Sequence, residues 1–380
     1  MKIALTGGHL TPALAVIDEL KKKPDNEIIF IGRAYSMEGD KSPSAESVVI
    51  PNLGIKFYSI QAGRLQRKFT RHTILALAKV PLGSLQALAI LSKEKPDVVM
   101  SFGSYVAFPS IFAAWVLGIP TITHEQTLKG GLSTRLISRF VKKIAVSWKD
   151  SKEFFAKEKV VLTGNPIRKE ILNLERKRSA RPVVYITGGN QGSHVINEIV
   201  EEILPNLLEN YEVIHQTGSS EAYKDFENAQ KKVQELPKRL KNRYLAAKWF
   251  NSDEVADIFS RSSLIVSRAG ANTVFEVAAL CLPAIFIPIP WSSGDEQTKN
   301  ASVLSDLKAA LILPQDRLTP RRLLSSIKYV FDNYGQFKKA AKAASKFVAH
   351  DAARLLVEEA EKLVKENETN QILPEKKTSV

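Results

Sequence analysis

The chain has 380 residues, of which 44% are hydrophobic and 25% charged. These proportions are typical of globular proteins, and the length allows two domains with separate cores. A single cysteine, Cys281, excludes a disulfide framework and a cysteine-rich metal site. Lys and Arg number 54 against 40 Asp and Glu, a net charge of +14, which favours an anionic partner. No nucleic-acid-binding motif is evident, so we expect that partner to be an anionic membrane surface and not nucleic acid.

The longest apolar stretch, residues 74–90, is interrupted by Lys79, Pro81 and Gln86. It is shorter than a typical membrane-spanning helix, so we expect no membrane span. The first residues run directly into a short apolar stretch and glycines, which does not fit a secretory signal. The low cysteine count agrees with a reducing cytoplasm.

Short β-branched runs alternate along the chain with longer amphipathic stretches, which is typical of parallel α/β units. A helix is predicted over Pro12–Lys23, with proline in its first turn and lysines at its end. The first series of predicted strands lies at 2–6, 27–32, 97–103, 120–125 and 143–147. A second series, after Pro166, lies at 182–189, 211–218, 242–250, 263–270 and 283–290.

Two successive series predict an α/β protein of two doubly wound, Rossmann-like domains, residues 1–165 and 166–335. Ligands of such sheets bind at the carboxyl ends of the strands, so we expect the two domains to face a cleft that holds the site. Residues 336–365 are predicted to form one or two helices that pack back on the N-terminal domain. The polar residues 366–380 are predicted to be a disordered tail.

Three glycine-containing turns follow predicted strands. In the first, Thr6-Gly7-Gly8-His9, the glycines allow close approach of a ligand, and the helix that follows offers unpaired amides to an anion. His9 would project into the cleft, where an imidazole can act as a general base. The alternative is a tight turn with a solvated histidine.

The second turn, Gly188-Gly189-Asn190-Gln191-Gly192-Ser193, lacks the G-x-G-x-x-G spacing, which argues against an NAD enzyme. Asn190 and Ser193 could instead help to hold a diphosphate at the start of a helix.

The third segment runs from Ser267 to Glu276 and is followed by a polar stretch that contains Gln297 and Asn300. The Glu276 carboxylate could accept hydrogen bonds from two ribose hydroxyls, although it could equally be a solvated helix residue. Gln297 and Asn300 are three residues apart and share one helix face, and their amides suit sugar hydroxyls.

The segments TGGHLTPALAV, GSYVAFP, HEQ, TGNPIR, GGNQGS, SRAGA and DEQ occur in the order and spacing of the MurG family of bacterial glycosyltransferases. The resemblance covers almost the whole chain to about residue 330. It implies the GT-B fold, in which two Rossmann-like domains face a cleft. It also implies inverting transfer of N-acetylglucosamine from UDP-N-acetylglucosamine to the muramyl 4-hydroxyl of undecaprenyl-linked lipid I, which gives lipid II. Such an enzyme serves peptidoglycan synthesis, cell shape and division as a peripheral protein on the cytoplasmic face of the membrane.

The resemblance also implies roles for single residues. In the second domain it implies UDP-N-acetylglucosamine contacts from Arg168, Asn190, Phe250, Ala271, Thr273, Glu276, Gln297 and Asn300, with Phe250 along uracil and Glu276 on the ribose. In the first domain it implies acceptor contacts from Thr6, Gly7, Gly8, Tyr105, His124 and Gln126. His9 is the expected general base, and Glu125 and His124 stay open as alternatives. Folds of this kind stabilise the departing UDP with helix dipoles and hydrogen-bond donors, so we expect neither a catalytic metal nor a cofactor.

The chain departs from the family pattern at six positions. Ala4 and Leu5 stand where the family has two further glycines, Ser104 replaces glycine, Thr127 asparagine, Asn190 serine, and Glu296 histidine. The last three lie on expected ligand contacts and leave the identity of the acceptor open. The alternatives are a glycosyltransferase with another lipid acceptor and a catalytically silent nucleotide-sugar-binding subunit.

A basic segment precedes the apolar stretch 74–90. Arg64, Arg67, Lys68, Arg71 and Lys79 flank it, and we expect them to dock on anionic lipid beside the entry of the polyprenyl substrate. A core helix with a solvated basic edge is the alternative.

Overall fold

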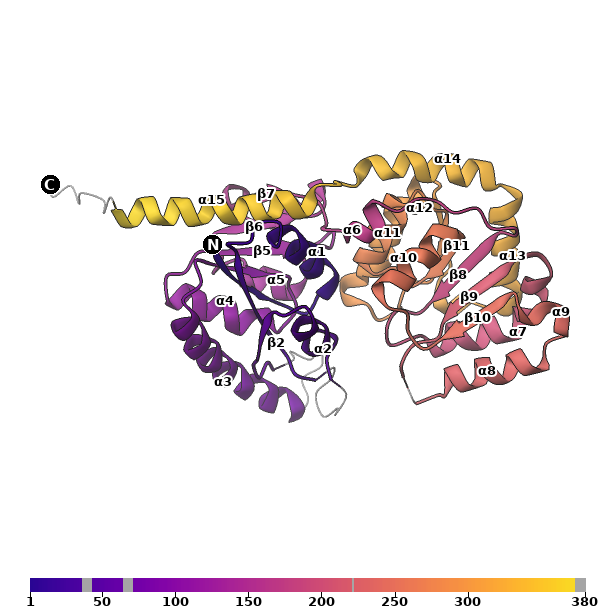
Figure 1. Cartoon of the computed structure of the whole chain (residues 1–380), viewed down its shortest axis with the longest axis horizontal. Coiled ribbons are helices and arrows are strands. Elements are labelled where there is room, and N and C mark those ends of the chain that lie inside the picture. Colours follow the sequence, from indigo (N-terminus) through magenta and orange to yellow (C-terminus); the bar gives the residue numbers. More distant parts are fainter. Residues whose placement is uncertain (36–42, 64–70, 221, 373–380) are drawn as a thin grey trace. The chain divides into compact units, whose positions relative to one another are not determined.

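The computed structural model describes residues 1–35, 43–63, 71–220 and 222–372. The chain divides into two compact units, Met1–Arg168 with Asp351–Val380, and Lys169–His350 (Figure 1). Each unit holds one parallel sheet covered by helices on both faces, so the prediction of two Rossmann-like, doubly wound domains is confirmed. The division after Arg168 falls three residues beyond the predicted boundary at 165.

The first unit is built on a seven-stranded sheet of order β3-β2-β1-β4-β5-β6-β7. Its strands are β1 Lys2–Thr6, β2 Glu27–Gly32, β3 Lys56–Ser59, β4 Val98–Ser101, β5 Thr121–Glu125, β6 Lys143–Val146 and β7 Val160–Leu162. Its helices are α1 Leu10–Leu20, α2 Ala45–Asn52, α3 Arg71–Glu94, α4 Ala107–Val116, α5 Leu132–Ile137 and α15 Ala352–Ile372, with 3₁₀ turns η1 Lys149–Phe154 and η2 Lys157–Lys159.

Both faces of this sheet are buried, which explains why its strands read as continuous apolar runs. On one face Ile3 and Leu5 of β1 pack with Val16 of α1 and Leu356 of α15. On the other face Ala4 belongs to a cluster with residues of α3 and α4. The start of α1 at Leu10, two residues before the predicted Pro12, places His9 at the helix N-cap.

The second unit is built on a six-stranded sheet of order β10-β9-β8-β11-β12-β13. Its strands are β8 Val183–Thr187, β9 Glu212–Gln216, β10 Tyr244–Ala247, β11 Ser262–Ser267, β12 Ala284–Phe286 and β13 Ala310–Ile312. Its helices are α6 Lys169–Leu172, α7 His194–Asn210, α8 Asp225–Glu235, α9 Lys238–Lys241, α10 Ser252–Arg261, α11 Ala271–Ala279, α12 Glu296–Asp306, α13 Pro320–Asp332 and α14 Tyr334–Ala344, with 3₁₀ turns η3 Ser293–Asp295, η4 Gln315–Arg317 and η5 Ser345–Phe347.

Strand order reverses at one place in each sheet. In the first sheet β1 lies between β2 and β4, and in the second β8 lies between β9 and β11. In doubly wound sheets such reversal points, here the carboxyl ends of β1 and β4 and of β8 and β11, are where ligands bind. The glycine turns singled out in the sequence follow β1, β8 and β11, so they lie at these two positions.

The C-terminal helices divide between the units, which differs from the prediction that residues 336–365 pack on the N-terminal domain. Helix α14 packs against α11 and α13 of the second unit, whereas α15 packs against α1 of the first. Helix α15 also continues to Ile372, so residues 366–372 are helical where a disordered tail was predicted. Residues 373–380 lie outside the described residues.

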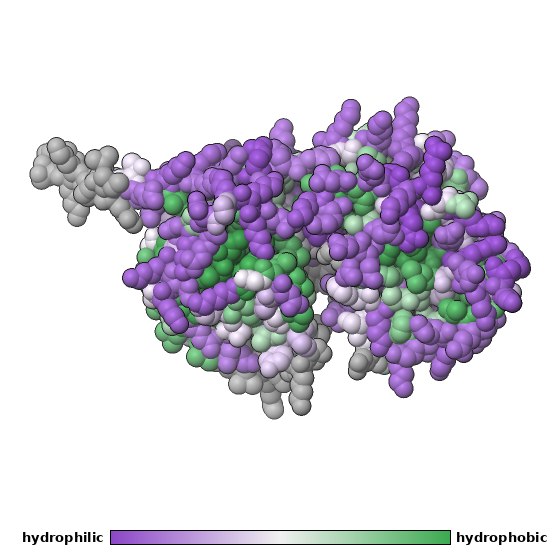
Figure 2. Space-filling view, viewed as in Figure 1, coloured by the Kyte–Doolittle hydropathy of each residue, from purple (hydrophilic) through white to green (hydrophobic). Residues whose placement is uncertain are grey.

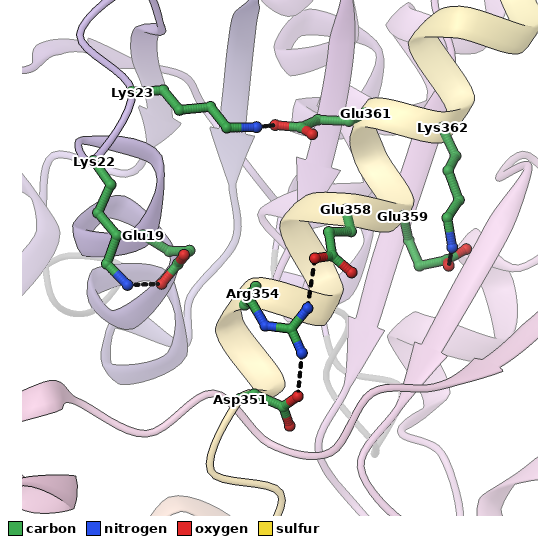
Figure 3. Close-up of polar contacts among 9 residues, drawn as sticks. All are labelled: Glu19, Lys22, Lys23, Asp351, Arg354, Glu358, Glu359, Glu361 and Lys362. Atoms are coloured by element: carbon green, nitrogen blue, oxygen red, sulfur yellow. Dashed lines mark hydrogen bonds and ion pairs between the residues drawn. The ribbon is translucent and has the colours of Figure 1, made fainter.

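The outer face of α15 is hydrophilic, and hydrophobic residues of the first unit lie beneath the helix (Figure 2). Its buried side chains include Leu356, Val357, Ala360 and Leu363. Ion pairs run along its exposed face, and Lys23, just after α1, pairs with Glu361 of α15 (Figure 3). Burial of this apolar stripe, more than the exposed ion pairs, holds α15 on the unit.

No helix in the described ranges combines the length and the hydrophobicity needed to cross a membrane. Of the basic residues expected to dock on lipid, Arg64, Arg67 and Lys68 lie outside the described residues, and so does the side chain of Arg71.

Candidate active site

The turn after β1 packs directly against the turn after β4. Gly7 has φ +127°, and a Cβ there would lie 2.9 Å from the carbonyl oxygen of Gly103, so only glycine fits. The Gly8 amide donates to the same carbonyl at 3.3 Å. Thr6, the last residue of β1, is buried and its hydroxyl donates to Ser110 Oγ at 3.2 Å. The two turns therefore form one rigid edge.

Four of the six positions that depart from the family pattern have visible consequences here. Ala4 and Leu5 are fully buried strand residues of β1, so the turn begins only after Thr6. Ser104 has φ +70°, a left-handed conformation that suits the glycine it replaces better than serine. Thr127 donates to Glu125 Oε1 from its amide at 2.8 Å and from its hydroxyl at 2.7 Å.

His9 lies at the N-cap of α1 and makes no side-chain capping bond. Its ring lies beside Gly103, where a Cβ would be 3.6 Å from His9 Cδ2. Burial lowers the pKa of His9, Glu125 raises it and Arg33 lowers it further, with a net pKa below the usual 6.5. At neutral pH the imidazole is therefore uncharged and able to accept a proton.

Glu125, at the end of β5, is buried and has both carboxylate oxygens engaged. Oε1 accepts the two bonds from Thr127, and Oε2 accepts one from the Gly131 amide at 3.0 Å. These bonds order the loop between β5 and α5 and place a negative charge that acts on His9.

His124 is 2% exposed and faces the neighbouring strand ends. Its Nε2 lies 3.1 Å from both the Gly164 carbonyl oxygen and Ser147 Oγ. Burial lowers its pKa to about 4. This geometry suits a neutral, structural histidine more than a base.

Gln126, the next residue, is also buried, and its Oε1 has no hydrogen-bond partner among the described residues. A buried amide oxygen of this kind calls for a donor from a ligand or water.

Tyr105, in the turn after β4, accepts a hydrogen bond at its hydroxyl from Arg33 NH1 at 2.9 Å. Arg33 follows β2 directly and also donates from Nε to Glu46 Oε1 at 3.1 Å. Arg33 is not among the site residues predicted from the sequence. Its position immediately after a buried strand was the signal that could have found it.

In the second unit the turn between β8 and α7 packs against the end of β9. A Cβ at Gly192, where φ is +81°, would lie 2.0 Å from the Thr217 carbonyl oxygen, so the close approach requires glycine. The buried Asn197 side chain donates to that same carbonyl at 2.9 Å and to Asp225 at 2.8 Å. Asn190 is exposed in this turn, and Ser193 is the N-cap residue of α7 but makes no side-chain capping bond.

Arg268, directly after β11, connects several of these strand ends. NH2 donates to Ser193 Oγ and to Gln315 Oε1, each at 2.6 Å, and NH1 donates to the Ile287 carbonyl at 3.0 Å. Burial lowers its pKa to about 10. Within the described ranges it has no carboxylate partner, so a cation lies beside the glycine turn with only neutral acceptors around it. Sequence reasoning missed this residue, although it lies inside the quoted SRAGA segment.

Helices α11 and α12 carry the remaining second-unit residues that are expected to contact UDP-N-acetylglucosamine, and they place them at the same edge of the sheet. Ala271 and Thr273 lie in the first turn of α11, and Glu276 is a buried carboxylate in its second. Gln297 Oε1 accepts from the Ile289 amide at 3.0 Å. Asn300 Nδ2 donates to the Ala269 carbonyl at 3.3 Å, while the buried Asn300 Oδ1 lacks a partner among the described residues.

Three further positions with expected ligand contacts are Phe250, Glu296 and Arg168. Phe250 is 7% exposed and packs against Tyr185 at a centroid distance of 6.5 Å, so little of its ring is open to a bound uracil. Glu296 begins α12. Arg168 is the last residue of the first unit, and its contact with a diphosphate stays a prediction from the resemblance. Among the described side chains no cluster of three or more His, Cys, Asp or Glu has an arrangement that could hold a metal ion.

Comparison with known proteins identifies the two units. The glycosyltransferase family 28 N-terminal domain matches residues 6–146, and the family 28 C-terminal domain matches residues 183–356. Among solved structures, that of Acinetobacter baumannii MurG has a TM-score of 0.69 at 25% identity and covers 95% of this chain and 99% of its own. A UDP-GlcNAc 2-epimerase from Neisseria meningitidis, with a TM-score of 0.64 at 16% identity, shares the fold alone.

Curated relatives extend over nearly the full length. The UDP-N-acetylglucosamine--N-acetylmuramyl-(pentapeptide) pyrophosphoryl-undecaprenol N-acetylglucosamine transferase of Halalkalibacterium halodurans is 34% identical over 370 residues, which cover 94% of this chain and 98% of the relative. The enzyme of the same name from Borrelia hermsii is 32% identical and covers 92% of both chains. With both domains matched and the strand-end turns in place, the chain belongs to the MurG family of family 28 glycosyltransferases.

Proposed function

We propose that this glycosyltransferase moves N-acetylglucosamine from UDP-N-acetylglucosamine to the muramyl 4-hydroxyl of undecaprenyl-linked lipid I, giving lipid II for peptidoglycan synthesis. The observation that carries the proposal is the relationship over more than nine-tenths of the chain to enzymes named for this transfer. The crevice residues of the two sheets support it, because each sheet presents glycine turns, helix N-termini and polar side chains at its point of strand reversal.

The second unit would hold the donor. The first turns of α7 and α11 both lie at the strand reversal, and their unpaired amides suit the donor diphosphate. Arg268 adds a positive charge beside Ser193, and its lack of a carboxylate partner among the described residues favours an anionic ligand nearby. Glu276 would accept from the ribose hydroxyls.

The sugar would lie against α12. Asn300 Oδ1, which has no hydrogen-bond partner among the described residues, is suited to accept from a sugar hydroxyl. The Gln297 amide group retains donors beyond the bond it accepts at Oε1. Arg168 and Asn190 would contact the diphosphate, and Phe250 would border uracil.

The first unit would hold the acceptor, with His9 as general base. The neutral His9 imidazole takes the proton of the muramyl 4-hydroxyl while that oxygen forms its bond to C1 of N-acetylglucosamine and the C1–O bond to UDP breaks. Attack from the face opposite UDP inverts the anomeric centre. The departing UDP carries the electron pair, and the helix N-termini of the second unit stabilise its charge.

Glu125 and His124 are less suited to this task. Glu125 already accepts three bonds from its own loop, and His124 faces Gly164 and Ser147 inside the sheet. We assign Glu125 to the stabilisation of the imidazolium that forms on His9, since its charge acts on that ring. Gln126 and Tyr105 would contact the acceptor.

An apolar surface on the first unit would bind the membrane. The neighbouring helices α3 and α4 expose Leu85, at 63%, and Trp115, at 54%. Arg139 and Lys142 are exposed beside Phe140, whose ring contacts Trp115 at 5.4 Å. We call Leu85, Trp115 and Phe140 the apolar helix surface, and Arg139 and Lys142 are the basic residues that flank Phe140. Each basic residue adds about 1 kcal/mol of attraction to an anionic leaflet, which supports peripheral binding at the cytoplasmic face of the membrane.

The assignment of the base is tested by His9→Ala and Glu125→Gln, with the donor affinity of each measured by calorimetry. We expect His9→Ala to lower turnover by about 10²–10⁴-fold with UDP-N-acetylglucosamine binding unchanged, and Glu125→Gln to lower it less. In the wild-type protein kcat/KM should fall only below pH 6.5, because burial depresses the pKa of His9. Turnover by His9→Ala close to the wild-type value would reject His9 as the base, and a product with retained configuration by NMR would reject direct attack.

A further inference from the structure

Arg33 occupies a place at the acceptor edge that neither the motifs nor the comparisons assign. It follows the last residue of β2, and β2, β1 and β4 are neighbours in the sheet. The turns after these three strands carry Arg33, His9 and Tyr105 respectively. A guanidinium at this edge therefore lies among the residues that would meet the acceptor.

The backbone at Arg33 is held firmly by the start of α2. The Ser44 hydroxyl donates to the Arg33 carbonyl oxygen at 2.6 Å, and the Ser44 amide donates to the Ala34 carbonyl oxygen at 2.9 Å. Ser47 Oγ donates to the same Ala34 oxygen at 3.0 Å. Arg33 is thus fixed by a helix N-terminus, and this anchor sets the direction of its side chain.

The side-chain contacts of Arg33 leave it suited to an anion. Nε donates to the buried Glu46 carboxylate, and NH1 donates to the hydroxyl of Tyr105, whose ring centroid lies 5.9 Å from the guanidinium carbon. Among the described residues these are the two bonds that the Arg33 side chain donates, out of five N–H donors. Tyr105 accepts from Arg33, and its own hydroxyl hydrogen is donated to none of the described residues, so it is suited to an acceptor on a ligand. The side chain remains 28% exposed.

The glycine turn beside Arg33 is short, and its Gly8 amide already donates to the Gly103 carbonyl oxygen at 3.3 Å. Ala4 and Leu5 belong to β1, so the turn contributes glycines only at Gly7 and Gly8. A planar guanidinium matches the oxygens of a phosphate and carries a permanent charge. Its charge reaches the neighbouring base, since Arg33 acts to lower the pKa of His9.

We propose that Arg33, together with the Tyr105 hydroxyl, binds the diphosphate of the polyprenyl-linked acceptor and so positions its sugar hydroxyl at His9. This inference rests on the proposed function. In this inference the Tyr105 hydroxyl donates to the acceptor diphosphate, and Arg33 is a specificity-determining residue for a diphosphate-linked acceptor.

The test compares Arg33→Gln with Glu46→Gln, which removes the same ion pair but keeps the guanidinium. Two acceptors are used, a lipid I analogue and the same molecule with an uncharged linker in place of the diphosphate. We expect Arg33→Gln to raise KM for the diphosphate acceptor by about 10–100-fold and to change KM for the uncharged acceptor by less than about twofold. Glu46→Gln should leave both values within about threefold of the wild type, and Arg33→Lys should restore part of the loss.

A pH profile supplies a second readout. Within the described part of the chain, the charged or titratable groups that act on His9 are Glu125 and His124 from β5 and Arg33 from the end of β2. Loss of the positive charge should move the acidic limb of kcat/KM to higher pH in Arg33→Gln, and not in the surface control Lys22→Gln.

The inference would be overturned if Arg33→Gln and Glu46→Gln raised KM equally, or if Arg33→Gln raised KM equally for both acceptors. Either result would assign Arg33 a structural role. Donor affinity is measured in parallel, and a change there would also overturn the inference. If the wild-type protein transfers no sugar to lipid I, the proposed function itself fails, and this outcome is distinct from all the others.

Discussion

At the scale of single residues, charge and hydrogen bonding at the two sheet edges indicate the role of each site residue better than residue type alone does. His9 is held neutral by burial, whereas Glu125 is committed to Thr127 and Gly131. Arg268 is a cation surrounded by neutral acceptors. A buried charge without a counterion lowers stability, so its presence is best explained by an anion that binds there.

Replacement of Arg268 by methionine tests this explanation. We expect Arg268→Met to weaken UDP-N-acetylglucosamine binding by about 10–100-fold, the value of a charge-assisted hydrogen bond to a phosphate. The free energy of unfolding should change by no more than about 1–2 kcal/mol, because the lost bonds are offset by removal of a buried charge. Calorimetry with the donor and urea unfolding measure the two effects. A large loss of stability with unchanged donor affinity would contradict the assignment.

At the scale of secondary-structure elements, the sequence predicted the central strands and missed the strands β3, β7 and β13. Central parallel strands are buried on both faces and read as continuous apolar runs that end in glycine turns. The missed strands are the outermost ones of their sheets, only three or four residues long, and Lys56 in β3 is exposed. Short edge strands carry a weaker pattern than central ones, although the four-residue edge strand β10 was predicted.

The candidate site was predictable to a similar degree. The glycine turns carried a signal, because Gly7 and Gly192 make approaches that exclude a side chain. Arg33 and Arg268 carried no signal in the sequence apart from their positions after strands, because an arginine there resembles any solvated residue.

The packing of α15 on the first unit also depends on contacts between residues more than 300 positions apart, such as Lys23 with Glu361.

Helix α15 should contribute to the stability of the first unit through its buried stripe. Leu356 is fully buried in the cluster that contains Ile3 and Val16. We expect Leu356→Ala to lower the free energy of unfolding by about 2–5 kcal/mol. Arg354→Ala removes only exposed ion pairs (Figure 3) and should cost less than about 1 kcal/mol. Urea unfolding followed by circular dichroism measures both, and equal effects would contradict this packing of α15.

At the scale of the whole molecule, the net charge of +14 and the apolar helix surface favour an anionic membrane. We expect Leu85→Ser with Trp115→Ser to reduce binding to phosphatidylglycerol vesicles by about tenfold or more, because two exposed apolar side chains leave the interface. The matched control is Tyr329→Ser, which removes a side chain of similar exposure, 54%, from α13 in the second unit. Co-sedimentation measures binding. Equal binding by the double variant and the control would place the membrane contact elsewhere.

The central claim is that the chain transfers N-acetylglucosamine to lipid I. It is tested most directly with radiolabelled UDP-N-acetylglucosamine and three reactions, which contain a lipid I analogue, diacylglycerol or no acceptor. The account predicts label on the lipid I analogue alone, with turnover lost in His9→Ala. Label on diacylglycerol, or none on lipid I while the donor still binds, would contradict it.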